Sequence, residues 1–476
     1  MIYKKSFLKI ILFGFSSILF LFSCQQKPQK PNFIIFLVDD LGWMDVGYMG
    51  SEYYETPNID QMAKEGMVFT NAYANSPNCA PTRASLMSGM YAPRHGVYTV
   101  GNPARGKSEN RMLIPHPNNT ELAGSFVTLA EALKENGYTN AHIGKWHLGE
   151  EEETSPEAQG FDVNIGGTHA GHPKTYFSPY KNPKLSDGKD GEYLTDRLTD
   201  EALQFVEQNK DNPFFLYFAH YAVHTPIQAK KEITARYENK ETSNGQDNPK
   251  YAAMVESTDQ SLGRVLQKLK ELDLDENTVV LFFSDNGGHG GITSQYPLKG
   301  SKGMLYEGGF REPMIAWWPG KIKSGSTNDE VVMGFDFYPT LVELAGGTPE
   351  KYKTDGESLV PLILDKGTWN REAVYWHFPA YLEGYKGIKN PEDLVRGWRA
   401  VPSGAIRKGD WKLIENFEDA SLQLYNLAED ISEKNNLVET NPEKVEELLR
   451  DMRAWRKEVD APVPGEKNPS YLSSTP

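Results

Sequence analysis

The stretch that decides the fold is residues 32–40, NFIIFLVDD, in which a continuous apolar run at residues 33–38 is followed by two adjacent aspartates. Short runs without polar alternation are typical of strands buried on both faces of a parallel sheet. Further runs of this kind lie along the chain, at residues 139–143, 214–219, 279–283 and 315–318. Segments with helical periodicity lie between them, at residues 127–136, 195–208 and 251–272. The pattern predicts an α/β fold in which a mostly parallel central sheet is sandwiched by helices.

Ionisable or amide side chains follow four of these apolar runs directly. In chain order they are Asp39, Asp40, Lys145, His147, His220, His224, Asp285 and Asn286. Ligands of open parallel sheets bind beyond the carboxyl ends of the strands. We therefore expect these side chains to meet in one site.

Four members of this set offer hard oxygen atoms: Asp39, Asp40, Asp285 and Asn286. Such ligands suit calcium or magnesium rather than zinc or copper. Taken singly, each of these residues is better interpreted as a helix or turn cap than as a metal ligand. Adjacent carboxylates are costly unless a cation neutralises them, so the two clusters together favour a metal site.

Residues 79–89, CAPTRASLMSG, predict a helix that begins at Cys79, because Pro81 suits a first helical turn. The positive end of that helix and Arg83 would both favour an anion. On this segment alone, a buried structural cysteine at the start of an ordinary helix is an equal alternative. Lysines and histidines in glycine-rich turns, namely Lys145, His147, His224 and Lys302, could donate to a tetrahedral oxyanion.

The composition excludes several classes of protein. Of 476 residues, 65 are acidic and 50 basic, so the net charge of -15 opposes binding to a nucleic-acid backbone. Two cysteines cannot form a disulfide framework. The 39% hydrophobic and 24% charged residues are typical of a globular chain and exclude a disordered or coiled-coil one.

The N-terminus has the layout of an export signal, with Lys4, Lys5 and Lys9 preceding an apolar stretch. Residues 21–24, LFSC, resemble the bacterial lipoprotein box. That resemblance implies cleavage after residue 23 and lipidation of Cys24, with an ordinary export signal as the alternative. We expect residues 1–23 to be the signal peptide and residues 24–31 a tether. The protein would then be lipid-anchored to a bacterial membrane, facing the periplasm or the cell surface.

The rest of the chain divides into two predicted domains. Residues 32–345 would form the catalytic domain, residues 346–370 a connection, and residues 371–476 a smaller C-terminal α+β subdomain. The last part contains hairpin-like pieces and a final helix, at residues 405–407, 411–414, 422–425 and 442–459. Two long irregular stretches, residues 166–192 and 381–404, are predicted to be lids or pocket walls.

Several of these segments together resemble the type I sulfatases, the formylglycine-dependent family with the alkaline-phosphatase-like fold. The matching segments are residues 32–42, 79–89, 137–149, 224–226, 284–287 and 302–309. The pentapeptide CAPTR combined with GKWH at residues 144–147 is highly specific. Residues 404–412 and 424–427 resemble the small C-terminal domain of the family. Thr82, Ser88 and Asn140 are mild departures, and none removes a functional group.

The resemblance implies that Cys79 is oxidised to formylglycine by a formylglycine-generating or anaerobic sulfatase-maturating enzyme. Its hydrated form would attack sulfur, release the alcohol, and then expel sulfate through the second hydroxyl. The implied calcium ligands are residue 79 with the four residues of the oxygen-rich set, Asp39, Asp40, Asp285 and Asn286. Asp285 would also accept the proton of the nucleophile.

The remaining roles are implied by the same resemblance. Arg83 would orient the diol, and Lys145 and Lys302 would bind the sulfate oxygens. His224 would act as general acid on the leaving alcohol, and His147 would take a proton during sulfate elimination.

Substrate recognition is specified less sharply. An exported, tethered sulfatase suggests a sulfated polysaccharide or oligosaccharide, either algal, such as ulvan or carrageenan, or glycosaminoglycan-like. His95, His172 and Tyr381 are candidates to contact it, and further candidates for the mouth of the site are Asn102, His169, Lys174, Tyr176, Trp376 and His377. The competing functions are a phosphodiesterase or phosphonate monoester hydrolase on the same fold, and a glycan-binding lipoprotein without activity.

Overall fold

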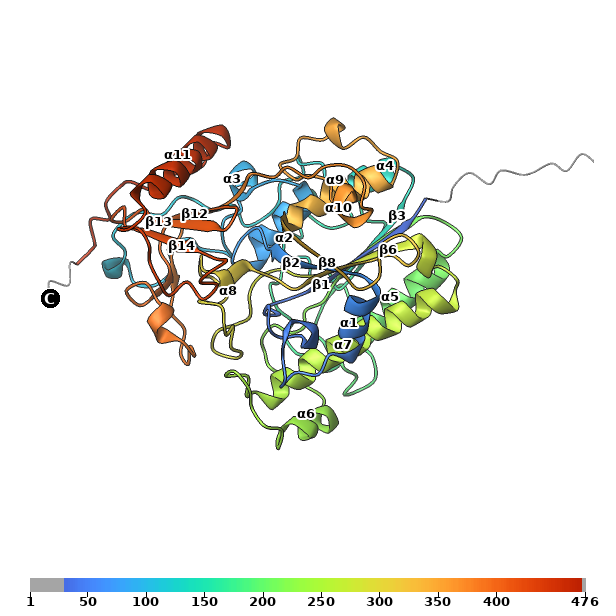
Figure 1. Ribbon diagram of the computed structural model, residues 1–476. Coiled ribbons are helices and arrows are strands. Elements are labelled where there is room, and N and C mark those ends of the chain that lie inside the picture. The colour runs from blue at the N-terminus through green and yellow to red at the C-terminus, as the bar shows by residue number, and fades with distance from the viewer. Residues whose placement is uncertain (1–29, 473–476) are drawn as a thin grey trace, which may run out of the picture.

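An eight-stranded sheet forms the centre of the larger domain in the computed structural model, which describes residues 30–472 (Figure 1). Its strands are β1 (Asn32–Val38), β2 (Met67–Tyr73), β3 (Thr139–Gly144), β4 (Val163–Ile165), β5 (Phe214–Ala219), β6 (Thr278–Ser284), β7 (Met314–Trp317) and β8 (Ser326–Met333). Their order is β4-β3-β5-β1-β6-β7-β2-β8. Only β7 runs antiparallel to its neighbours β6 and β2. The prediction of a mostly parallel sheet is therefore confirmed.

Helices cover both faces of this sheet. Successive residues of a central strand point in opposite directions, so each central strand packs against both helix layers. Ile34 and Phe36 of β1 pack toward α1 (Pro57–Glu65), α5 (Leu194–Gln208) and α7 (Pro249–Glu271). Phe33 and Ile35 pack on the other face, toward α2 (Cys79–Ser88), α4 (Leu129–Glu135) and α9 (Phe337–Leu344). Figure 1 shows the two helix layers on either side of the strands. The predicted sandwich is confirmed.

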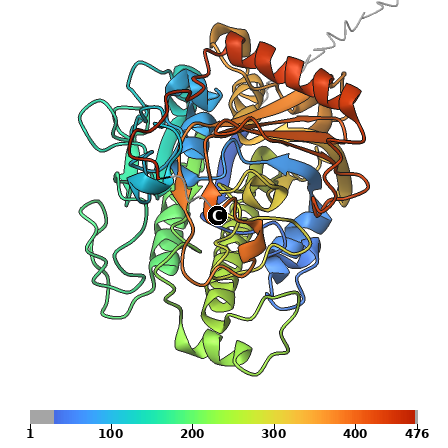
Figure 2. The same cartoon turned by 90° about the vertical axis from the view of Figure 1, so that its left-hand side faces the viewer.

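A second, antiparallel sheet has the order β14-β13-β12-β9. Its strands are β9 (Ala373–Phe378), β12 (Ser403–Lys408), β13 (Trp411–Asn416) and β14 (Leu422–Asn426). Helix α11 (Pro442–Glu458) lies across it (Figure 2). Leu448 and Met452 of this helix pack on Ile406 and Leu413 of the sheet. A separate hairpin pairs β10 (Leu382–Glu383) with β11 (Trp398–Ala400).

The remaining elements are short. The α-helical ones are α3 (Ala92–His95), α6 (Lys231–Tyr237), α8 (Glu307–Phe310) and α10 (Val360–Ile363). The 3-10 turns are η1 (Gly47–Met49), η2 (Ser108–Asn110), η3 (Asp275–Asn277), η4 (Gly334–Asp336), η5 (Pro349–Lys351) and η6 (Pro391–Asp393). Within residues 30–472, no helix combines the length and apolar character that crossing a membrane would require. The predicted signal peptide and Cys24 lie outside the described residues.

A buried ion cluster joins the second sheet to the domain that contains the eight-stranded sheet. The ammonium of Lys412 on β13 lies 3.0 Å from Glu307 Oε1 of α8 and 2.8 Å from Glu433 Oε1. The Lys412, Glu307 and Glu433 side chains are inaccessible to solvent. Burial raises the pKa of Glu433 to about 7; the nearby Glu307 acts in the same direction, and Lys412 opposes it.

We predict that the stability of the protein depends on pH through Glu433, and that Glu433→Gln removes this dependence. The folded chain holds a proton on Glu433 that the unfolded chain, with a pKa near 4.5, has lost, so stability falls as pH rises from about 4.5 to 7. We expect the unfolding free energy of wild type to fall by about 1–3 kcal/mol across this window relative to Glu433→Gln. Denaturant unfolding at pH 5 and pH 8 measures it. The exposed Glu429→Gln is the control, and equal pH dependence in all three proteins would contradict the prediction.

Candidate functional site

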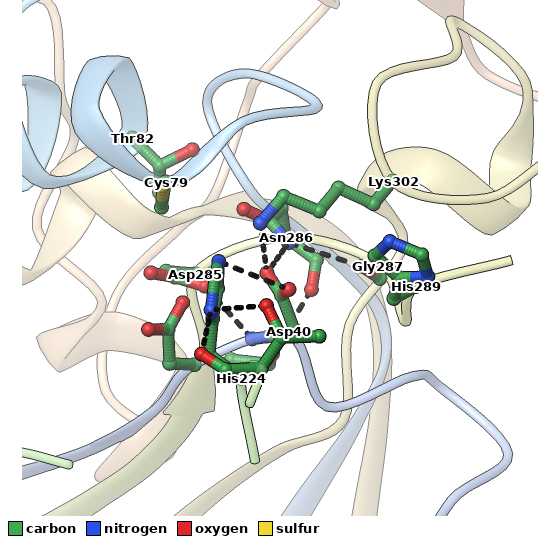
Figure 3. Close-up of polar contacts among 12 residues, drawn as sticks. Asp40, Cys79, Thr82, His224, Asp285, Asn286, Gly287, His289 and Lys302 are labelled. Atoms are coloured by element: carbon green, nitrogen blue, oxygen red, sulfur yellow. Dashed lines mark hydrogen bonds and ion pairs between the residues drawn. The ribbon is translucent and has the colours of Figure 1, made fainter. Parts of the chain in front are cut away.

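The site lies where four neighbouring parallel strands end. Strands β3, β5, β1 and β6 are adjacent in the sheet, so the residues that follow them meet at one edge. Asp39 and Asp40 follow β1, Lys145 and His147 follow β3, His224 lies beyond β5, and Asp285 and Asn286 follow β6. Figure 3 shows the side chains of Asp40, His224, Asp285 and Asn286 converging below Cys79. His220 is not part of the group: it is buried against Phe36 and Phe218, with Nε2 3.0 Å from the Ser261 hydroxyl.

Cys79 is the first residue of α2 and is only 2% exposed. Its Sγ lies 3.4 Å from His147 Nδ1 and within 4.8 Å of a carboxylate oxygen of Asp39 and of Asp285. Burial raises the pKa of the thiol, so an unmodified Cys79 is protonated at neutral pH. The position thus combines a helix N-terminus, a neighbouring imidazole and two carboxylates.

Three buried ion pairs surround this residue. Lys145 Nζ lies 2.7 Å from Asp39 Oδ2, and Lys302 Nζ lies 2.6 Å from Asp40 Oδ1. Arg83 contacts Asp285 Oδ2 through both Nε and Nη2 at 2.8 Å, and its Nη1 donates to the Lys145 carbonyl. Because these charges are desolvated, removing one partner would leave the other uncompensated.

Three buried oxygens of the acidic residues accept no hydrogen bond from the described residues. They are Asp39 Oδ1, Asp40 Oδ2 and Asn286 Oδ1. Buried polar atoms without partners are rare in native proteins and require an explanation. Oxygens from carboxylates and a side-chain amide are the ligands that calcium prefers. The donor set therefore fits a hard divalent cation.

The electrostatics of the two adjacent aspartates support this reading. Burial, and then the charge of Asp285, raise the pKa of Asp39 well above its usual range. Burial would raise the pKa of Asp40 too, but the charges of Lys302, His224 and Lys145 outweigh it and hold that pKa far below normal. A bound cation would oppose this rise in the pKa of Asp39. Asp40 also has a left-handed backbone with φ 62°, a strain found most often at functional sites.

The two histidines face the site as neutral imidazoles. Burial and the charges of Lys145 and Arg83 lower the pKa of His147, whose backbone is also left-handed at φ 65°. Burial and Lys302 lower the pKa of His224, whose Nε2 lies 3.6 Å from Asp40 Oδ2. A neutral His147 beside the Cys79 side chain can accept a proton from it.

The predicted substrate contacts divide into exposed and buried residues. His172 is exposed and stacks on His224, with centroids 6.0 Å apart and an interplanar angle of 8°. His95 is wrong as a substrate contact: it is 2% exposed, and its Nε2 lies 3.0 Å from the Ser85 hydroxyl beneath α2. Tyr381 is also wrong, because it is fully buried and its hydroxyl donates to Glu418 Oε1 at 2.6 Å.

The other candidates for the mouth divide in the same way. The buried residues Tyr176, Trp376 and His377 belong to the protein interior. His169 is partly exposed near His147, and Asn102 and Lys174 are exposed. Sequence reasoning missed His289, which follows Asp285 and Asn286 closely and lies on the Lys302 side of the site (Figure 3).

Comparison with known proteins agrees with this geometry. A family model described as Sulfatase matches residues 31–347. The chain belongs to the sulfatase family. A second model, described as N-sulphoglucosamine sulphohydrolase, C-terminal, matches residues 300–459. The protein is therefore a sulfuric ester hydrolase, and both the resemblance and the fold class expected from the sequence are confirmed.

Relatives match along most of this sulfatase. A sulfatase of Formosa agariphila is 34% identical, and the alignment covers 96% of this chain and 95% of the relative. Human N-acetylgalactosamine-6-sulfatase is 34% identical over 73% of this chain and 69% of its own length. The solved structure of Ps i-CgsB in complex with k-i-k-neocarrahexaose is 32% identical, covers 94% of this chain and 96% of that one, and has a TM-score of 0.74.

Proposed function

We propose that this sulfatase removes sulfate from sulfated oligosaccharides or polysaccharides, with a formylglycine made from Cys79 and one calcium ion. The observation that carries the proposal is the position of Cys79 at the start of α2, beside two acidic residues and His147. Similarity to an enzyme solved with neocarrahexaose and to an N-acetylgalactosamine-6-sulfatase supports a carbohydrate of the carrageenan or glycosaminoglycan class.

Asp39, Asp40, Asp285 and Asn286 would hold the calcium ion through the oxygens that lack hydrogen-bond donors and their neighbours. When bound, the cation would neutralise the clustered carboxylates and lower the pKa of a hydroxyl on residue 79. Arg83 would orient Asp285 through the paired contact at 2.8 Å.

The lysines and histidines of the site would handle the sulfate oxygens and the protons. Lys145 and Lys302 would bind sulfate oxygens, since each ammonium has donors beyond the one bonded to an aspartate. His147 would take a proton from residue 79 at Nδ1. His224 would deliver a proton to the leaving oxygen. Its lowered pKa means that it needs the negative charge of a bound sulfate to become protonated.

The test is ion chromatography of sulfate released from a panel of defined sulfated saccharides, run beside nitrophenyl sulfate and nitrophenyl phosphate diesters. We expect sulfate release from some saccharides, and the formylglycine mass in the tryptic peptide that contains residue 79. A clear preference for the phosphorus esters would favour the phosphodiesterase or phosphonate hydrolase alternative. Sugar binding without any release would favour the inactive glycan-binding alternative.

Replacement of His224 by alanine should depend on the leaving group. Loss of a general acid lowers kcat by about 10²- to 10⁴-fold when the leaving alkoxide of a sugar needs a proton. Nitrophenolate needs no proton, so we expect a much smaller loss with nitrophenyl sulfate. Rates for both substrates, with the exposed Lys231→Ala as the control, measure the difference. Equal losses on both substrates would contradict the proton-donor role.

We further propose that Cys24 carries a lipid anchor and that a maturation enzyme oxidises Cys79 before or during export. Labelled palmitate should be incorporated into the wild-type protein and not into Cys24→Ser. Incorporation that is equal in both proteins would contradict the anchor.

A further inference from the structure

An aromatic and cationic cluster from two domains borders the Lys302 side of the site. Tyr385 stacks on His289, with ring centroids 4.1 Å apart and an interplanar angle of 18°. The Tyr385 hydroxyl accepts a hydrogen bond of 2.8 Å from the Gly290 N–H, so the ring is held in place. The guanidinium carbon of Arg399, on β11, lies 4.3 Å from the Tyr385 centroid. Tyr385 therefore links His289, near the reacting centre, to Arg399.

Arg399 lies directly against the backbone that carries Lys302. Its Nη1 is 3.4 Å from the Lys302 carbonyl. A Cβ added at Gly303 would lie 3.1 Å from Arg399 Nη1. Its Nε donates to the Glu383 carbonyl at 2.8 Å. Arg399 forms no ion pair with any residue in the range 30–472. Its positive charge is thus held close to the catalytic lysine without a carboxylate partner.

A second arginine, Arg105, lies on a segment that packs against β11. Ala104 forms a β-bridge with Tyr381, and a Cβ at Gly106 would touch the Trp398 ring, so the segment around Arg105 packs along β11 and its neighbours. Arg105 is partly buried, donates to the Val100 carbonyl at 2.5 Å, and has no carboxylate partner within the described chain. Burial lowers the pKa of Arg399; Tyr385 and Glu383 oppose this, and the charge of Arg105 acts in the same direction as burial.

Two like charges in a partly desolvated position are unfavourable unless an anion joins them. Arg83 pairs with Asp285 and Arg371 with Asp336, whereas Arg399 and Arg105 form no ion pair within the described chain. Guanidinium groups bind sulfate and carboxylate through paired hydrogen bonds, and aromatic rings pack against the apolar faces of sugars.

We propose that Arg399 and Arg105 bind a second anionic group, a sulfate or a carboxylate, on the saccharide whose sulfate ester is cleaved, and that Tyr385 and His289 form the wall along which this sugar lies. The inference rests on the proposed saccharide sulfatase function and narrows its substrates to saccharides with at least two negative charges near the cleaved ester.

The test compares disaccharides that carry one sulfate ester, two sulfate esters, or one sulfate ester and one uronic carboxylate. We expect wild type to have the higher kcat/KM for a doubly charged disaccharide, mainly through a lower KM. Arg399→Gln should reduce the ratio of doubly to singly charged kcat/KM by about 10- to 100-fold, the value of a charge-assisted hydrogen bond. Arg396→Gln, three residues away and paired with Glu418 and Asp419, is the matched control and should keep the wild-type ratio.

Calorimetric titration of Cys79→Ala with the same disaccharides separates the two levels of the proposal, because it needs no turnover. We expect Cys79→Ala to bind a doubly charged disaccharide more tightly than a singly charged one, and the double variant Cys79→Ala/Arg399→Gln to lose this difference. That result supports the anion site even if no disaccharide is hydrolysed and the proposed function fails. The affinities for the disaccharide with two sulfate esters and for the one with a uronic carboxylate show whether the second anion is a sulfate or a carboxylate. The same affinity for singly and doubly charged disaccharides, or a ratio unaltered in Arg399→Gln, would overturn the inference.

Discussion

Replacement of Cys79 by alanine is expected to lower kcat for sulfate release by about 10⁴-fold or more, because alanine cannot be oxidised to the formylglycine that we propose as the nucleophile. No other side chain can replace it, since the described residues place only Cys79 both at the α2 N-terminus and next to His147. The measurement is sulfate release by ion chromatography under single-turnover and steady-state conditions.

The controls for this variant address folding and modification separately. Alanine suits a helical first turn and is smaller than cysteine, so the melting temperature should change little. Mass spectrometry of the residue-79 peptide in wild type reports the modified fraction, which should scale with activity across preparations. Full activity in a preparation that contains only intact thiol would contradict the formylglycine assignment.

Replacement of Asp40 by asparagine is expected to weaken calcium binding by about 10²- to 10³-fold and to lower kcat/KM at least as much. The substitution removes the negative charge that Lys302 and the cation would share. Loss of a group that coordinates the cation directly weakens binding more than loss of a group that only contacts the ligands. Asparagine tolerates the left-handed backbone at φ 62°, so the loop geometry is preserved. Calcium titration by calorimetry and sulfate release measure the two effects.

The matched control is Asp45→Asn, five residues further along. Asp45 is equally buried, but both its oxygens already accept hydrogen bonds, from the Gly42 N–H and the side chains of Gln246, Tyr251 and Thr293. We expect Asp45→Asn to bind calcium like wild type, whatever its effect on stability. Unchanged calcium affinity in Asp40→Asn would show that the cation, if bound, lies elsewhere.

The continuous apolar runs predicted the central strands closely. Residues 214–219 coincide with β5, and the runs at 33–38 and 279–283 fall within one residue of β1 and β6 at either end. Strands β2 and β8 were not predicted, because polar residues interrupt their sequences MVFTNAY and STNDEVVM toward the edge of the sheet. The reversed direction of β7 could not be predicted either, since an apolar run is the same read in both directions.

The residues of the site also divide into those that the sequence predicted and those that it did not. The expectation that strand ends deliver Asp39, Lys145 and Asp285 to one place needed only the rule for parallel sheets. Lys302 lies in a loop without periodicity, and its role came from the family resemblance. His95 and Tyr381 were misassigned because polar side chains near functional motifs can equally turn inward, and only packing decides which side they face.

By itself, the sequence determined the α/β class, the acidic and basic residues at the strand ends, and the specific signature around Cys79, because these depend on local periodicity and on neighbouring residues along the chain. Only the tertiary structure decided that three oxygens of the acidic set lack donors, that Arg399 lies beside Lys302, and that Tyr385 stacks on His289. Those relations join residues about a hundred or more positions apart, and they arise from the packing of two domains, which no local pattern encodes.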